Sequence, residues 1–347
     1  MVVTMYPWQQ TAWTRLQQMR ARLPHAILFH GPAGIGKADF METFAQALLC
    51  ENARPDGHAC GACASCGWFA QHNHPDYRRV RPEALEDEPS AEGEDGAESS
   101  TAAAGKAKSS KAPSKEIKIE QVRALGDFMN ISTHRQGLRV VVLYPAEALN
   151  MPASNALLKT LEEPPPGTVF LLASNSLDRL LPTILSRCRK FALPMPGHDE
   201  ALAWLKQQGV PDADSWLREQ GGAPLAALAE AEAGSREDLE ALLHFLANPA
   251  VDGALRAAEK LSKAALPALV AWQQRWLYDV FSMKLSGRVR YYPRYQKELA
   301  ALAARVPAAR LNRAVKAATE RRAVADHPLS AKLFVEDMLL EYTSCCA

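Results

Sequence analysis

Net charge and long apolar runs are what this sequence most clearly lacks. Its 347 residues carry 40 Lys and Arg against 39 Asp and Glu, a formal net charge of +1 at pH 7. A charge this small gives no global positive field that would draw the chain onto nucleic acid. If the protein acts on DNA, we therefore expect it to depend on more basic partners. No apolar run approaches the roughly 18 residues of a membrane-spanning helix, and the first residues do not resemble a signal peptide. We therefore expect a cytoplasmic protein without membrane contact.

Cysteine occurs at seven positions, four of them close together. In the cytoplasm we expect these thiols to be reduced or metal-bound rather than joined in disulfides. The spacing C-x9-C-x2-C-x2-C is typical of a tetrahedral zinc site, in which four thiolates leave no open position, so the predicted zinc is structural. The four are Cys50, Cys60, Cys63 and Cys66. The terminal pair, Cys345 and Cys346, has no such spacing, and we assign it no role.

Strands and helices are predicted to alternate through residues 1–196. The five strand candidates are residues 26–29, 76–80, 139–144, 168–173 and 190–193, and most of them are apolar. Helical patterns separate these runs. Continuous apolar strands between helices argue for a parallel sheet that is covered on both faces. The sequence therefore predicts an α/β domain with a five-stranded parallel sheet, the core of a P-loop nucleotide-binding fold.

Residues 81–118 differ in composition from the residues around them. This segment begins acidic and ends basic, with Ala, Gly and Ser between and almost no apolar residue. Such a composition buries too little surface to offset the entropy lost on ordering, so we expect a disordered surface insertion. The alternative is a tethered arm that binds nucleic acid or protein, although charge blocks are usually only solvated.

Only helical patterns follow residue 197. We predict a small helical domain at 197–234 and a larger one at 235–347. Apolar residues recur at helical spacing in the larger domain, and such a stripe usually belongs to the core. This stripe consists of Trp272, Trp276, Leu277, Val280 and Phe281.

A glycine-rich loop follows the first predicted strand and precedes a predicted helix, the context required of a Walker A phosphate loop. Its characteristic residues are Gly31, Gly34, Gly36 and Lys37. Backbone amides of such a loop cradle phosphates, and the lysine reaches the outer phosphates. The alternative is a tight strand-to-helix turn without a ligand. The residue after Lys37 is Ala38 rather than Ser or Thr, so the hydroxyl that binds magnesium is missing, and ATP binding stays open.

The strand that should supply catalytic acids lacks them. A Walker B strand ends in acids that hold magnesium and orient the attacking water. Here the strand ends in Tyr144 and Pro145, which do neither, and Glu147 lies beyond the strand end. We therefore expect no ATP hydrolysis. Ser174 and Asn175 end another strand, where this fold places a polar sensor residue, and we treat them as structural.

Two further stretches carry a resemblance to a known family. Residues 155–165, Asn-Ala-Leu-Leu-Lys-Thr-Leu-Glu-Glu-Pro-Pro, and the triplet 186–188, Ser-Arg-Cys, resemble signature motifs of bacterial clamp-loader AAA+ subunits. Residues 6–9 and 74–76 are also similar to that family. The resemblance implies that the helical domains are a lid and an oligomerising collar, and that a four-cysteine zinc module follows the first P-loop helix. The charged insertion departs from the family pattern.

The family contains an ATP-hydrolysing motor type, tau/gamma, and a non-hydrolysing delta-prime type. The resemblance implies that a motor keeps a hydroxyl after the Walker lysine, acids after the strand and a sensor arginine in the lid. This sequence has Ala38, Tyr144, Pro145 and Pro224 at those places, which favours the delta-prime type. The resemblance then implies that Arg187 is an arginine finger, supplied in trans to the ATP site of a neighbouring subunit. The alternative is that Arg187 caps a helix or pairs with an acid.

These observations lead to one expectation with two alternatives. We expect a non-hydrolysing stator of the replicative clamp loader, in a hetero-pentameric ring with motor (tau/gamma) and delta subunits. The ring would load the sliding clamp onto primed DNA, as part of the DNA polymerase III holoenzyme. The first alternative is an active AAA+ ATPase, which Ala38, Tyr144 and Pro145 oppose. The second is a zinc-containing DNA-binding protein, which the near-neutral charge opposes.

Overall fold

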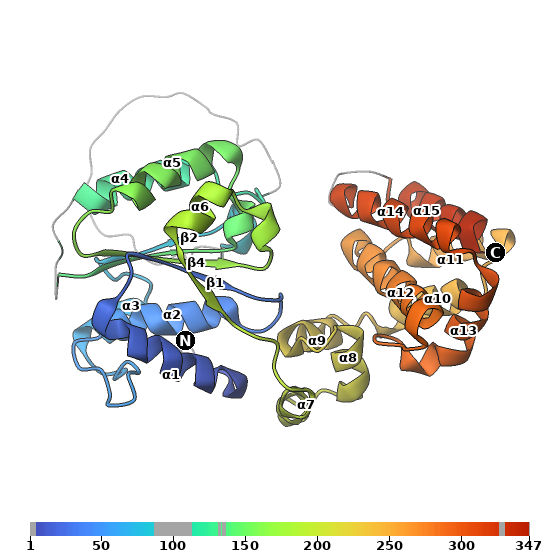
Figure 1. The fold of residues 1–347 in the computed structure, drawn as a ribbon, viewed down its shortest axis with the longest axis horizontal. Coiled ribbons are helices and arrows are strands. Elements are labelled where there is room, and N and C mark those ends of the chain that lie inside the picture. The colour runs from blue at the N-terminus through green and yellow to red at the C-terminus, as the bar shows by residue number, and fades with distance from the viewer. Residues whose placement is uncertain (1–4, 87–112, 131–132, 134–136, 326–329, 347) are drawn as a thin grey trace, which may run out of the picture. The chain divides into compact units, whose positions relative to one another are not determined.

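The computed structural model describes residues 5–86, 113–130, 133, 137–325 and 330–346. The chain divides into two compact units, Met1–Pro194 and Met195–Ala347 (Figure 1). Each unit contains a hydrophobic core cluster of its own. No described helix is long and apolar enough to cross a membrane.

The first unit is built on a five-stranded parallel sheet in the order β2-β3-β4-β1-β5, which confirms the predicted fold class. The strands are β1 Ala26–His30, β2 Tyr77–Val80, β3 Arg139–Leu143, β4 Thr168–Ser174 and β5 Arg189–Ala192. Its helices are α1 Gln10–Met19, α2 Lys37–Leu49, α3 Ala64–Ala70, α4 Ile119–Asn130, α5 Met151–Glu162 and α6 Pro182–Arg187. Helices α1–α3 cover one face of the sheet and α4–α6 the other (Figure 1).

The burial of the strands follows their place in the sheet. Every residue of β3 and β4 is buried, because helices cover both faces of these inner strands. The edge strand β5 buries one residue of its four. This pattern explains why the inner strands are continuous apolar runs in the sequence. Because β1, β3 and β4 are parallel, their carboxyl ends lie at one edge of the sheet, where the phosphate loop begins.

The predicted charged insertion is narrower than residues 81–118. Its central part, 87–112, lies outside the described residues. Near its carboxyl end Ile117 is fully buried, and its N–H donates to the carbonyl oxygen of Ala148 at 2.8 Å. Lys118 pairs with Glu83 at 2.7 Å, where a short 3-10 helix, Glu83–Leu85, forms. The prediction was therefore too wide, because Ile117 is an apolar anchor within an otherwise polar stretch.

The second unit is helical throughout its described residues. Its helices are α7 His198–Gln207, α8 Ala213–Glu219, α9 Pro224–Glu232, α10 Arg236–Ala247, α11 Val251–Leu261, α12 Leu266–Ser286, α13 Gln296–Arg305, α14 Ala308–Val324 and α15 Ala331–Cys346. One hydrophobic cluster runs through them from Ala201 to Cys346. The division of this unit into a lid at 197–234 and a collar at 235–347 stays a prediction.

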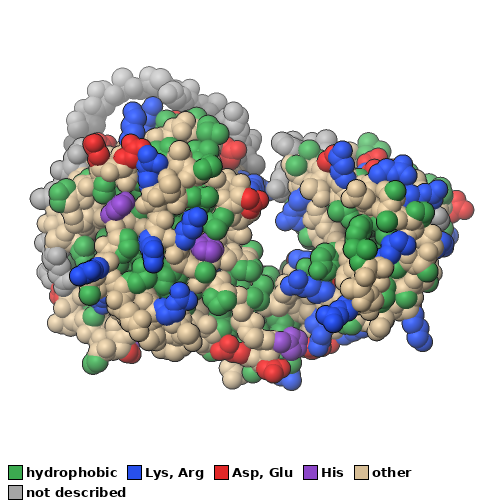
Figure 2. Space-filling model, in the orientation of Figure 1, with side chains coloured by type: hydrophobic (Ala, Val, Ile, Leu, Met, Phe, Trp, Pro, Cys, Tyr) green, Lys and Arg blue, Asp and Glu red, His purple; other side chains and the backbone are tan. Residues whose placement is uncertain are grey.

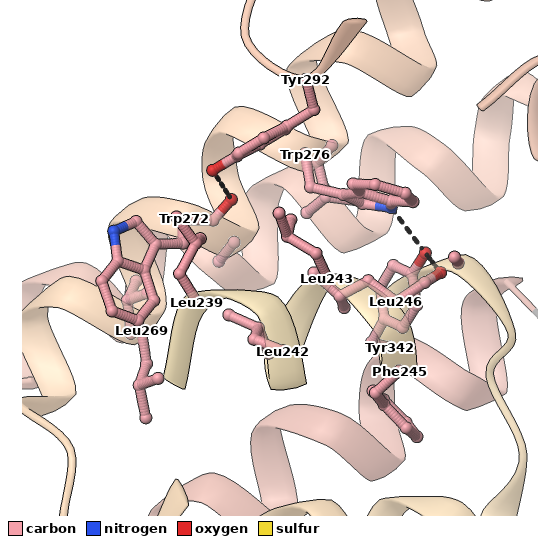
Figure 3. Close-up of a cluster of buried hydrophobic side chains, with 14 of the residues drawn as sticks. Leu239, Leu242, Leu243, Phe245, Leu246, Leu269, Trp272, Trp276, Tyr292 and Tyr342 are labelled. Atoms are coloured by element: carbon pink, nitrogen blue, oxygen red, sulfur yellow. Dashed lines mark hydrogen bonds between the residues drawn. The ribbon is translucent and has the colours of Figure 1, made fainter. Parts of the chain in front are cut away.

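The aromatic stripe of α12 lies in that core, as predicted. Trp272, Trp276, Leu277 and Val280 are buried, and Phe281 is partly buried. Figure 3 shows the hydrogen bonds around Trp276, whereas the buried indole N–H of Trp272 has no hydrogen-bond partner among the described residues. The indole N–H of Trp276 donates to the Tyr342 hydroxyl at 2.9 Å, and that hydroxyl donates to the carbonyl oxygen of Leu246 at 2.7 Å. The two bonds link α12, α15 and α10 through the middle of the core.

A buried carboxylate fixes the loop that follows α12. The side chain of Asp279 is fully buried. Its Oδ1 accepts the backbone N–H of Arg290 at 2.9 Å, and its Oδ2 accepts those of Tyr291 and Tyr292 at 2.9 and 2.8 Å. Burial raises the pKa of this carboxyl, while the three N–H donors act in the opposite direction.

Replacing Asp279 by Ala is expected to lower the free energy of unfolding of the second unit by about 3 kcal/mol. Three backbone N–H groups lose their acceptor, and each unsatisfied buried donor costs about 1–3 kcal/mol. Urea unfolding followed by tryptophan fluorescence measures the change, because Trp272 and Trp276 lie on the same helix. Asp252→Ala, at an exposed position of α11, is the control and should change little. Equal unfolding midpoints for the two variants would refute the anchoring role.

Candidate functional site

The phosphate loop lies between β1 and α2, the context predicted from the sequence. Gly34 and Gly36 have φ angles of +74° and +80°, a region that side chains with a Cβ disfavour. At Gly36 there is also no space, because a Cβ would lie 2.4 Å from the ring of Tyr6. The conformation and the close approach together account for glycine at this position.

Lys37, the first residue of α2, makes two hydrogen bonds within the first unit. Its Nζ donates to the carbonyl oxygen of Pro32 at 2.5 Å and to Oδ1 of Asn175 at 2.6 Å. Burial lowers the pKa of the Lys37 ammonium to about 8, and Glu147 acts in the opposite direction. The group that would reach a phosphate is therefore bound to the loop itself and to the residue after β4.

The catalytic positions opposite the loop carry no acid. The Tyr144 hydroxyl, just after β3, donates to Oε1 of Glu42 at 2.9 Å. Burial, followed by the nearby Glu42 carboxylate, raises the pKa of this phenol to about 12. Tyr144 is therefore a neutral donor and offers no anionic ligand to a metal. Glu147 is also engaged, because its Oε1 accepts the backbone N–H of Asn175 at 3.0 Å.

The amino-terminal segment, residues 6–9, packs against the phosphate loop and donates hydrogen bonds to it. The rings of Tyr6 and Trp8 stack at a centroid distance of 4.9 Å. The indole N–H of Trp8 donates to the carbonyl oxygen of Ile35 at 3.0 Å. Nε2 of Gln9 donates to the carbonyl oxygen of Gly36 at 2.8 Å. In the sequence these residues carry only a family resemblance, and no spacing predicts their contact with the loop.

Arg187 is the last residue of α6, and about a third of its side chain is exposed. Its Nη1 donates to the carbonyl oxygen of Thr183 at 2.9 Å and its Nη2 pairs with Glu162, the last residue of α5. Among the described residues it makes no hydrogen bond with loop 31–37. The predicted alternative, pairing with an acid, is thus present in the isolated chain. The guanidinium is nevertheless oriented and partly accessible.

The four predicted metal ligands come together. The Sγ atoms of Cys50, Cys60, Cys63 and Cys66 all lie within 4.8 Å of one another. Two of the separations, Cys50–Cys63 and Cys60–Cys66, are 3.9 Å. Tetrahedral zinc with Zn–S bonds of about 2.3 Å sets its sulfurs about 3.8 Å apart, so the cluster fits a zinc ion. The same distances exclude disulfides, whose S–S bond is about 2.05 Å.

Backbone N–H groups point at the sulfurs of this cluster. The N–H of Cys60 donates to Sγ of Cys50 at 3.2 Å, and that of Cys66 donates to Sγ of Cys63 at 3.4 Å. The N–H groups of Ala62 and Cys63 donate to Sγ of Cys60 and lower its pKa to about 6. Burial raises the pKa of Cys50 and of Cys66. The N–H groups thus favour the thiolate form of Cys60, whereas burial opposes it at Cys50 and Cys66.

Comparison with known proteins identifies the family of this chain. Residues 8–196, the P-loop unit, match the family model described as DNA polymerase III, delta subunit. The chain is 37% identical to DNA polymerase III subunit delta' of Pseudomonas aeruginosa over 81% of its length and 78% of that protein's. With the Escherichia coli subunit delta' the identity is 31%, over 79% and 75%. A gamma subunit-related protein from Thermotoga maritima has a TM-score of 0.45 at 16% identity, covering 98% and 100% of the two chains. The chain therefore belongs to the delta-prime family of DNA polymerase III subunits.

Proposed function

We propose that this chain is the non-hydrolysing stator of a replicative clamp loader. In this role it occupies a hetero-pentameric ring with motor (tau/gamma) and delta subunits, in the cytoplasm, and helps to load the sliding clamp onto primed DNA. The observation that carries the proposal is the nature of the residues around the phosphate loop. Ala38 stands in place of the Ser or Thr whose hydroxyl binds magnesium, and Tyr144 and Pro145 stand in place of the acids at the end of a Walker B strand.

The contacts of the loop support the absence of turnover. Phosphoryl transfer depends on positioning and on charge neutralisation by metal ions. Here the Tyr144 hydroxyl donates a hydrogen bond to the carboxylate of Glu42 on α2, and Glu147 accepts a backbone N–H. A nucleotide would also have to displace the two internal bonds of Lys37. We infer that ATP binding, if it occurs, is weak and unproductive.

The surface charge agrees with a subunit that depends on partners for its hold on DNA. On the face that Figure 2 shows, Lys and Arg side chains are scattered among uncharged ones, and acidic side chains lie mostly toward the edges. The net charge of +1 supplies no long-range attraction to phosphate. This is what is expected of a component that acts on primed DNA through a complex.

In the same proposal Arg187 is an arginine finger for the ATP site of the neighbouring motor. Three features support this role: its partial exposure, the absence of a hydrogen bond to loop 31–37 among the described residues, and its orientation by Thr183 and Glu162. A planar, permanently charged guanidinium suits stabilisation of a transferring phosphoryl group. Glu162 would share or release the guanidinium when the neighbouring phosphate arrives.

The four-cysteine cluster completes the proposal as a structural zinc site. Cys50 would bring the end of α2 to the metal, and Cys63 and Cys66 would bring α3. Zinc held by four thiolates has no open position for substrate, so its contribution is folding energy rather than catalysis.

We predict that the purified chain alone does not hydrolyse magnesium-ATP above the level of its Lys37→Ala variant. The physical reason is that Ala38, Tyr144 and Pro145 stand where an ATPase has the hydroxyl that binds magnesium and the acids that hold magnesium and orient water. Phosphate release is measured for both proteins under identical conditions. Equal background rates support a stator. Turnover that disappears in Lys37→Ala would mean that the chain is an ATPase motor after all.

A further inference from the structure

A buried hydrogen-bond chain lies behind the four-cysteine cluster. Ser65, His74 and Asp76 are each at least 98% buried. The Ser65 hydroxyl lies 2.6 Å from the carbonyl oxygen of Leu49 and 2.8 Å from Nε2 of His74. On the other side of the ring, Nδ1 of His74 accepts the backbone N–H of Asp76 at 3.0 Å. Every polar atom of the imidazole is therefore engaged inside the protein.

The network assigns the tautomer of His74. Because Nδ1 accepts an N–H, it carries no proton, and a neutral ring then has its proton on Nε2. The Nε2–H donates to the Ser65 oxygen, which leaves the Ser65 hydroxyl to donate to the carbonyl of Leu49. All donors and acceptors in the chain run in one direction. Buried networks that are fully satisfied in this way hold their members in a single arrangement.

The hydrogen-bond network connects the two segments of the sequence that carry the cysteine ligands. Leu49 immediately precedes the ligand Cys50, and Ser65 lies between the ligands Cys63 and Cys66 on α3. The bond from Ser65 to Leu49 thus joins the two segments that carry ligands. His74 then ties this joint to the segment that enters β2.

Ring contacts follow the same route. Trp68 of α3 packs edge-on against His74 at a centroid distance of 6.0 Å. Phe69 packs on Tyr77, the first residue of β2, at 4.6 Å. One face of α3 is therefore fixed to the edge of the sheet, while its amino-terminal part presents the cysteines.

We propose that His74 is a positioning residue of the four-cysteine site, acting through Ser65 to hold α3 and the end of α2 at the spacing that the metal requires. The proposal rests on the proposed zinc site. It extends that site to residues that do not contact the metal. Partners that orient metal ligands from behind typically change metal affinity by about 10–100-fold when they are replaced.

The imidazole offers two substitutions that separate its hydrogen bonds. His74→Gln keeps an N–H near the place of Nε2 and can still donate to Ser65. His74→Asn keeps an acceptor near the place of Nδ1 and loses the bond to Ser65. Ser65→Ala removes the hydroxyl that connects His74 to the carbonyl oxygen of Leu49. The control is His72→Asn, because His72 is exposed, lies two residues away and has a positive φ that Asn tolerates.

The test is the affinity of the full chain for zinc, measured by competition with a chromophoric chelator, with circular dichroism to verify folding. We expect His74→Asn and Ser65→Ala to bind zinc about 10–100-fold more weakly, and His74→Gln and His72→Asn to remain near the parent. Cobalt substitution is a second readout, because the thiolate-to-cobalt absorption bands should weaken or shift only in His74→Asn and Ser65→Ala.

The outcomes distinguish a failure of the His74 proposal from a failure of the proposed zinc site. A parent chain that binds neither zinc nor cobalt contradicts the zinc site itself. A parent that binds zinc, with His74→Asn and Ser65→Ala binding equally well, leaves the zinc site standing and overturns the role of His74. Equal losses in His74→Gln and His74→Asn would overturn the route through Ser65, because only one of the two substitutions removes that bond.

Discussion

Replacing Arg187 by Ala is expected to slow ATP hydrolysis at the adjoining motor site by about 10³-fold or more, while the ring still assembles. Arginine fingers supplied in trans contribute about 10³–10⁵-fold to the rate of phosphoryl transfer. The side chain of Arg187 is partly exposed, and its only described ion pair is with Glu162. Its removal therefore leaves no gap in a buried core. Phosphate release by the reconstituted complex, with primed DNA and the sliding clamp present, measures the effect.

Two variants make the Arg187 experiment specific. Arg187→Lys keeps the positive charge but loses the planar fork of the guanidinium, so it should recover little activity. Arg179→Ala is the matched control, because Arg179 is exposed and lies on the connection that leads from β4 into α6, the helix that Arg187 ends. A complex with several ATP sites keeps the turnover of those that Arg187 does not adjoin. The total should therefore fall by the share of one site.

Assembly decides how a negative result is read. Size-exclusion chromatography should find the Arg187→Ala chain in the complex in the same proportion as the parent. If that assembled variant hydrolyses ATP at the rate of the parent, the finger assignment is wrong. Arg187 is then a residue that only pairs with Glu162 and caps α6 through the carbonyl oxygen of Thr183.

The sequence was sufficient for the fold class because the sheet has inner strands, β1, β3 and β4, whose burial leaves a clear apolar signal. Residues 140–143 and 169–173 are uninterrupted apolar runs, and only strands covered on both faces need such runs. The four cysteines were found for a similar reason, because a short spacing restricts them to one local cluster. In both cases the signal lies within a few residues of sequence.

The contacts around the phosphate loop were not predictable in this way. Asn175 lies 138 residues from Lys37, and only the order of the strands brings the two together. In the parallel pair β1–β4, His30 stands opposite Ser174, so the residues that follow these strands are neighbours. A hydrogen bond between side chains so far apart depends on the register of the sheet, which the apolar pattern does not specify.

The pairs Tyr144–Glu42 and Ser65–His74 were missed for a related reason. Glu42 appears in the sequence as an ordinary polar residue of a helix, yet it is buried and accepts the hydroxyl of Tyr144. His74 belonged to a family motif without a role attached to it. A buried polar residue is recognisable only when its partner is known, because the partner is what makes its burial tolerable.

Replacing Cys60 by Ser is expected to lower the affinity of the chain for zinc by more than about 100-fold. Loss of a direct ligand should exceed the 10–100-fold typical of residues that only orient ligands. Cys60 is a strong choice, because two backbone N–H groups donate to its sulfur and lower its pKa to about 6. Zinc content by elemental analysis and affinity by chelator competition give the result.

Cys188→Ser is the control for that experiment, because Cys188 is buried in the same unit but lies outside the cluster. Burial alone raises the pKa of its thiol to about 11, so it stays a neutral core group. This variant should keep its zinc, whatever stability it loses from the added hydroxyl. Zinc binding is folding energy in small metal modules, so Cys60→Ser should also expose the segment between α2 and α3 to protease. A Cys60→Ser chain that keeps both the zinc and the protease resistance of the parent would contradict the structural zinc site.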